Sequence, residues 1–203
     1  MSYSASTTLR KRQYLARCAL ASALCFIATI APLKGAVAAD EARLSIREAQ
    51  ATIDEGVFEL DAKLDLTLPE GARQAIEAGL TLRLTYEISV DRVRRYMPDA
   101  GVAALEQRYE VSYHALSQRY LVKNLNAGEQ QDFGSLQAAL DRVSELRGLP
   151  VLDTALITDG PDYEGRIRAV LKLNTAPDVL GWLLFWTDDW NVESEWKRWT
   201  LRP

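Results

Sequence analysis

Two segments of the chain alternate apolar and polar residues at every second position. Residues 58–68 alternate Phe, Leu and Ala with charged residues and Thr, and residues 80–91 alternate Leu, Tyr, Ile and Val with polar residues. Because successive side chains of a strand face opposite sides of a sheet, each segment predicts a long strand with one apolar face. Burial on a single face is typical of antiparallel sheets. The residues expected in the core include Leu64, Leu66, Leu82, Leu84 and Ile88.

A strand is also expected immediately before the first of these segments. In residues 43–53, Leu44 and Ile46 alternate with polar neighbours, and the three residues Asp54-Glu55-Gly56 follow. Acidic residues beside a glycine favour a tight turn between two extended segments. Residues 43–53 therefore predict a hairpin with the strand that begins near residue 58.

Three more extended regions follow in the second half of the chain. Residues 105–122 predict a strand in which the apolar positions switch phase midway, which is typical of a bulge or a bend. A turn at residues 124–128 then leads into a short strand that ends at Phe133. Residues 163–173 again place apolar side chains at alternate positions and predict one further strand.

Two short helices are expected between these strands. Residues 69–79 begin with Pro, are rich in Ala and end with Gly, which is typical of a short helix. After the potential cap Ser135, apolar residues recur at helical spacing from Leu136 to Leu146, and Arg147-Gly148 is expected to end this helix. The whole pattern predicts a mainly β (α+β) domain of antiparallel sheets packed as a sandwich, with two short helices.

Residues 1–39 have the composition of a secretory signal peptide. Basic residues at Arg10, Lys11, Arg12 and Arg17 precede an apolar run over residues 18–33, and small residues follow just before Asp40. This order of basic, apolar and small residues is the signature of Sec-type export. We expect cleavage of residues 1–39 and a periplasmic location for a single domain formed by residues 40–203.

The alternative for the same segment is an uncleaved membrane anchor. Its apolar run is about 16 residues long, and Pro32 and Lys34 interrupt its end. A membrane-spanning helix needs about 20 apolar residues. The length therefore favours a cleaved signal peptide over an anchor.

Removal of residues 1–39 makes the rest of the chain clearly acidic. Those 39 residues carry five of the 24 basic residues and none of the 28 acidic ones, which leaves residues 40–203 with a net charge of −9. Such a charge repels phosphate backbones and anionic lipid headgroups, so we expect no nucleic-acid partner. Both cysteines, Cys18 and Cys25, lie in the predicted signal peptide, so residues 40–203 have no thiol for catalysis, redox exchange or zinc binding.

Few residues after position 39 have the pattern of a catalytic or metal site. His114 is the single histidine, and Ser112 lies two residues before it, but no hydrolase motif surrounds the pair. The acidic turns at residues 159–162 and 188–189 lack the ligand spacing of a calcium loop. We therefore expect no catalytic residue, no metal and no cofactor, and keep His114 as a candidate contact residue.

The tryptophans are concentrated at the end of the chain. All five lie within its last 22 residues, where rings are expected to close the core and at least one to stay exposed. Exposed rings suit a glycan, a partner peptide or a membrane interface, and these tryptophans are the one route to membrane contact that the sequence offers. The candidate contact residues are therefore Trp182, Trp186, Trp190, Trp196 and Trp199.

Several stretches of the chain resemble one known family. They are Phe58-Glu59-Leu60-Asp61-Ala62, Arg108-Tyr109, Ser112-Tyr113-His114-Ala115-Leu116, Asn124-Leu125-Asn126-Ala127-Gly128 and, near the end, Asp189-Trp190, Ser194-Glu195-Trp196 and Trp199. The chain resembles the proteobacterial exported family catalogued as domain of unknown function 4390. The resemblance implies no catalytic or binding residue. It implies an envelope signalling partner, because genes of the family are found beside a membrane histidine-kinase sensor pair.

These observations favour a non-enzymatic periplasmic binding or interaction module. Its expected partner is an envelope protein, with a membrane histidine-kinase sensor as the candidate that the resemblance implies. The alternative is an envelope hydrolase that uses a pair of carboxylates which sequence patterns do not reveal.

Overall fold

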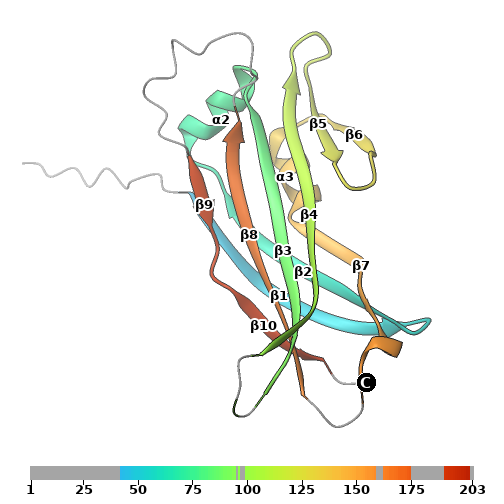
Figure 1. Ribbon diagram of the computed structural model, residues 1–203. Helices are drawn as coiled ribbons and strands as arrows, with labels where there is room; N and C mark the ends of the chain where they lie inside the picture. The colour runs from blue at the N-terminus through green and yellow to red at the C-terminus, as the bar shows by residue number, and fades with distance from the viewer. Residues whose placement is uncertain (1–41, 95, 97–98, 159–161, 175–189, 202–203) are drawn as a thin grey trace, which may run out of the picture. The chain divides into compact units, whose positions relative to one another are not determined.

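The computed structural model describes residues 42–94, 96, 99–158, 162–174 and 190–201. The chain divides into two units, residues 1–39 and 40–203, and all described residues belong to the second. This unit is built mainly from antiparallel strands that form two sheets (Figure 1). The prediction of a mainly β domain with antiparallel sheets and two short helices is confirmed.

The smaller sheet has three strands, in the order β1-β2-β7. β1 and β2 form the predicted hairpin, whose turn places Glu55 and Gly56 at positive φ. β7 pairs with the other edge of β2. The bounds of these strands are β1 Arg43–Asp54, β2 Val57–Thr67 and β7 Glu145–Asp153.

The larger sheet has the order β10-β8-β3-β4-β5-β6, and β9 also pairs with β8. Since β3 occupies one edge of β8, β9 and β10 share the opposite edge, each covering a different part of it. The bounds are β3 Thr81–Arg92, β4 Ala100–His114, β5 Arg119–Asn124, β6 Gln130–Phe133, β8 Tyr163–Asn174, β9 Asn191–Glu193 and β10 Lys197–Leu201.

Side chains from both sheets fill a large core cluster and a second, smaller one that includes Phe58, Val90 and Leu201. The even-numbered residues of β3 from Leu82 to Val90 are buried, as the alternation predicted, and leucines of β2 face them from the smaller sheet. Of the residues expected in the core, Leu64, Leu82, Leu84 and Ile88 are buried and Leu66 is half-buried. The antiparallel pairing leaves the other face of each long strand free for polar residues.

The two helices cover parts of this core. α2 (Glu70–Glu77) buries Ala72 and Ile76. α3 (Leu136–Val143) starts at Ser135, whose hydroxyl accepts a hydrogen bond from the backbone N–H of Ala138, as a helix cap does. Within the described ranges, neither helix is long and apolar enough to cross a membrane.

One buried tyrosine ties α3 to the larger sheet. The Tyr86 hydroxyl donates a 2.7 Å hydrogen bond to the backbone carbonyl of Val143, the last residue of α3. Burial raises the pKa of Tyr86 far above its ordinary value, so the hydroxyl keeps the proton that this bond requires.

The predicted single strand over residues 105–122 is wrong in one respect. It is a hairpin: β4 ends at His114, β5 starts at Arg119, and Gln118 adopts a positive φ in the turn between them. The phase switch in the sequence therefore marks a reversal of the chain rather than a bulge or a bend within one strand. Leu116 lies at the tip of the turn and is 94% exposed.

The predicted end of the second helix is also wrong. α3 stops at Val143, and the following residues form β7, which pairs with β2. Gly148 is at positive φ where the pairing register shifts, and its N–H donates to the Asp61 carboxylate at 2.9 Å, so it serves a bulge rather than a helix end. Pro150 is accommodated because β7 is an edge strand.

Candidate functional site

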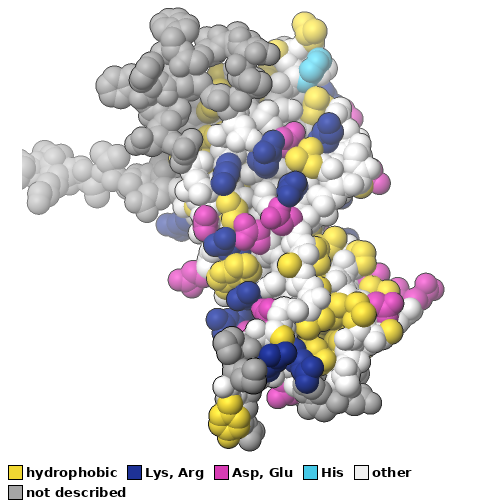
Figure 2. Space-filling view, in the orientation of Figure 1, with side chains coloured by type: hydrophobic (Ala, Val, Ile, Leu, Met, Phe, Trp, Pro, Cys, Tyr) yellow, Lys and Arg dark blue, Asp and Glu magenta, His cyan; other side chains and the backbone are white. Residues whose placement is uncertain are grey.

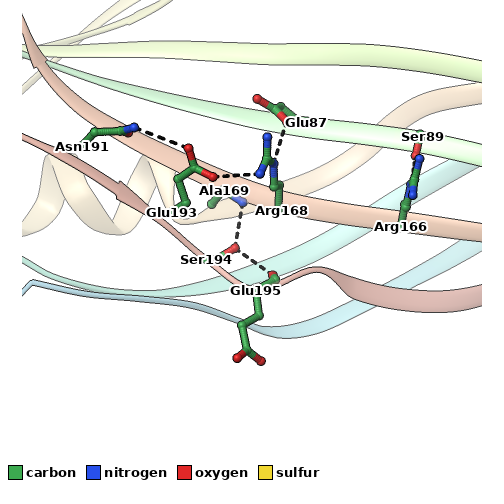
Figure 3. Close-up of polar contacts among 9 residues, drawn as sticks. All are labelled: Glu87, Ser89, Arg166, Arg168, Ala169, Asn191, Glu193, Ser194 and Glu195. Carbon is green, nitrogen blue, oxygen red and sulfur yellow. Dashed lines mark hydrogen bonds and ion pairs between the residues drawn. The ribbon is translucent and has the colours of Figure 1, made fainter.

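Trp196 lies in the short segment that joins β9 to β10 along the edge of β8. Ser194, two residues before Trp196, is buried, and its backbone N–H donates to the Ala169 carbonyl at 2.9 Å. The Ser194 hydroxyl accepts from the Ala169 N–H at 2.9 Å and donates to the Glu195 carbonyl at 3.0 Å (Figure 3). These bonds hold the segment against β8 although regular pairing is interrupted there.

The Trp196 ring covers two arginines on the outer face of β8. The guanidinium carbon of Arg166 lies 5.1 Å from the ring centroid, and that of Arg168 lies 4.9 Å from it. A cation over the face of an indole is attracted by the negative potential of the ring. The tryptophan nevertheless remains 39% exposed, so part of the ring is available for contact.

Neighbouring strands hold both arginines in place. Arg168 donates to Glu87 of β3 at 2.7 Å and to Glu193 of β9 at 2.8 Å (Figure 3). The hydrogen bond that Arg168 donates to Glu87 is the main reason that the pKa of Arg168 lies above its ordinary value. Arg166 donates to the Ser89 hydroxyl at 2.6 Å and pairs with Asp91 at 3.2 Å. Ion pairs this exposed add little to stability, so their main effect is to orient the arginines.

An open depression of about 490 Å³ adjoins the tryptophan on the same face. Arg108 pairs with Glu106 at its edge, and Asn126 donates to the Glu106 carbonyl at 2.8 Å. Figure 2 shows positive and negative side chains interspersed over this face. The surface, here called the Trp196 face, comprises Trp196, Arg166, Arg168, Ser89, Glu106, Arg108 and Asn126.

The structure places the other described tryptophans against the core. Trp190 and Trp199 are half-buried and pack against core residues. The Trp199 indole lies over Gly165 of β8, and its buried N–H has no hydrogen-bond partner within the described chain. Trp182 and Trp186 lie outside the described residues.

The structure does not bring His114 to the Trp196 face. His114 is exposed at the last position of β4, and its Nδ1 lies 2.9 Å from the Ser117 hydroxyl. Glu106, on the same strand, is eight residues away. At about 3.3 Å per residue, this separation is roughly 25 Å. His114 and Trp196, both predicted from the sequence as contact residues, are therefore far apart.

Sequence reasoning missed the arginines under Trp196. The alternation in residues 163–173 places Arg166 and Arg168 on the polar face of a strand, which was a usable signal. The order of the strands was unknown, so nothing in the sequence linked them to Glu87 or to Trp196. Among the described residues, no group of three or more His, Cys, Asp or Glu side chains is arranged to hold a metal ion.

Comparison with known proteins identifies one family. The family described as domain of unknown function DUF4390 matches residues 41–200, a range that includes β1 to β9 and most of β10. Membership of the family that the sequence motifs resemble is thereby confirmed. No curated protein and no solved structure matches the chain.

Proposed function

We propose that this chain, which belongs to the DUF4390 family, is a non-enzymatic periplasmic module that binds an envelope protein through the Trp196 face. The family's description names no activity, so the proposal is drawn from the surface of the chain itself. The observation that carries the proposal is the exposed indole held over two anchored arginines beside an open depression. Envelope signalling is the process in which we place it, and a membrane histidine-kinase sensor is the partner to test first.

The composition of the Trp196 face supports a protein partner. Tryptophan and arginine are the residues most enriched at the energetic centres of protein interfaces. Because Arg166 and Arg168 are already oriented by hydrogen bonds, binding costs little further ordering of these long side chains. The depression beside Trp196 offers space for a side chain of the partner.

The hydrolase alternative finds less support on this face. Glu87 and Glu106 are direct cross-strand neighbours, which is the kind of carboxylate pair that glycoside hydrolysis uses. Each of them is already engaged by an arginine, Glu87 by Arg168 and Glu106 by Arg108. Carboxylates that are paired with arginines in this way orient side chains on a surface, as a binding site needs. The pairing therefore favours binding over catalysis.

Export of the protein can be tested directly. We expect the protein recovered from the periplasm to begin at Ala39 or Asp40, because the small residues at 36–39 follow the apolar run of a signal peptide. N-terminal sequencing of the exported protein measures this. A chain that retains Arg10 and fractionates with membranes would establish the anchored alternative instead.

Trp196→Ala tests the contact surface. We expect the variant to lose most partner capture from cross-linked envelope, because the exposed ring is the centre of the Trp196 face. Its melting temperature should stay close to that of the wild type, since the ring is 39% exposed. The readouts are affinity capture with mass spectrometry and thermal melting by circular dichroism.

Leu116→Ala is the matched control for this experiment. Leu116 is a large exposed apolar residue at the β4–β5 turn, outside the Trp196 face, and its loss should leave capture intact. Undiminished capture by the folded Trp196→Ala variant would refute the proposed contact surface. Equal losses for both variants would show that capture depends on general surface hydrophobicity and would refute it as well.

A further inference from the structure

A second cavity lies on the inner side of the same strand that carries the Trp196 face. Arg108 of β4 faces outward, and its neighbours Gln107 and Tyr109 face inward, toward the smaller sheet. There β4, β5, the end of α3 and the start of β7 line a partly open cavity of about 490 Å³. Small-molecule sites in proteins commonly have volumes of this order.

Two nearly buried polar side chains of this cavity each have one polar atom without a hydrogen-bond partner among the described residues. Tyr109 is 6% exposed and packs edge-on against Tyr86, with ring centroids 6.4 Å apart. Its hydroxyl bonds to no group in the described ranges, whereas that of Tyr86 does. Gln107, also 6% exposed, donates its amide N–H to Asn124 at 2.7 Å, and its amide oxygen has no donor among the described residues. These two atoms are not fully buried, so they are accessible to solvent and available to a ligand in the cavity.

The cavity also carries an excess of positive charge. Arg147 at its wall pairs with Glu145 at 2.7 Å. Arg142, the last basic residue of α3, lines the same cavity and forms no ion pair within the described part of the chain. A guanidinium group binds carboxylate and phosphate oxygens through two parallel N–H donors. Arg142 is therefore available to bind an anionic group, because Glu145 pairs with Arg147 instead.

We propose that this cavity binds a small hydroxylated molecule that carries one oxyanion, either a carboxylate or a phosphate. Arg142 binds the oxyanion, and the Tyr109 hydroxyl and the Gln107 amide oxygen bind hydroxyl groups of the ligand. The site is separate from the Trp196 face, because it lies on the opposite face of β4 and is lined by different residues. The protein then combines a partner surface with a small-molecule site.

The proposal is tested by calorimetric titration of the exported protein with three probes. Gluconate carries a carboxylate, glucose 6-phosphate carries a phosphate, and glucose is neutral. We expect at least one of the two acids to bind, and glucose to bind at least about tenfold more weakly, a difference of ~1.4 kcal/mol. The acid that binds with the higher affinity shows whether the oxyanion of the ligand is a carboxylate or a phosphate.

Substitutions assign the contacts. Arg142→Gln should weaken binding of the preferred acid by about tenfold or more, and Tyr109→Phe should weaken it by several-fold while retaining the ring contact with Tyr86. The matched controls are Arg43→Gln, at the exposed start of β1, and Tyr113→Phe, outside the cavity, which should bind like the wild type. Thermal melting of each variant confirms that it is folded.

The outcomes separate this proposal from the proposed function. Absence of binding by both acids at millimolar concentration, equal binding of glucose, or an unchanged affinity in Arg142→Gln would each overturn the cavity proposal. Trp196→Ala should leave acid binding unchanged, because its ring does not line the cavity. A loss of partner capture without a loss of acid binding, or the reverse, therefore assigns each failure to its own site.

Discussion

Leu84→Asp should prevent the protein from accumulating in a folded state. Leu84 is fully buried in the middle of β3, between its neighbours Tyr109 on β4 and Leu171 on β8. An unpaired carboxylate at this position costs several kcal/mol, a large part of the roughly 5–15 kcal/mol that stabilises a domain. The measurement is the yield of soluble protein and, for any that is recovered, its thermal unfolding by circular dichroism.

Thr85→Asp is the control for the change at Leu84. Thr85 is the next residue of β3 and faces outward, opposite Arg108 of β4. The same new charge should therefore cost no more than about 1 kcal/mol there, which is the range of strand propensities. If Leu84→Asp were soluble and melted like the wild type, the assignment of the apolar face of β3 would be wrong.

Gly165→Ala should destabilise the edge of the larger sheet. A Cβ atom at Gly165 would overlap Cε2 and Cζ2 of Trp199, so the indole must move away from β8. Because Trp199 packs against both core clusters, its displacement removes buried contacts and weakens the pairing of β10 with β8. Overpacking of this kind costs about 1–3 kcal/mol or more. Urea unfolding followed by tryptophan fluorescence measures the loss.

A second glycine and a double-mutant cycle test the reason for this effect. Gly71 in α2 has no atom within 4 Å of its potential Cβ, so Gly71→Ala should stabilise the protein, by at most about 1 kcal/mol. In a Trp199→Ala background, Gly165→Ala should cost far less than it does alone, because the clashing ring is absent. Equal costs of Gly165→Ala in the two backgrounds would contradict the proposed contact.

Local patterns in the sequence were sufficient to identify the secondary structure that depends on short-range rules. The alternation in residues 80–91 is long and regular, so β3 and its buried face followed directly from the period of a strand. Ser135 identified the start of α3, because a cap hydroxyl acts within three residues. The turn at Glu55 and Gly56 depends on local backbone conformation in the same way.

Tertiary pairing decided what the local patterns left open. Residues after Val143 carry a helical spacing up to Leu146, yet they form β7, because β2 offers an unpaired edge and Leu146 becomes buried against it. The candidate sites depend on the same kind of long-range contact. Trp196 meets Arg166 and Arg168 only after β8 pairs with β9 and β10, and the inner cavity forms where β4 and β5 face β7. The sequence by itself therefore determined the long strand β3, the start of α3 and the turn at Glu55 and Gly56, since those depend on neighbours along the chain. Which side chains share a surface was decided by strand order, because pairing brings together residues that local periodicity cannot relate.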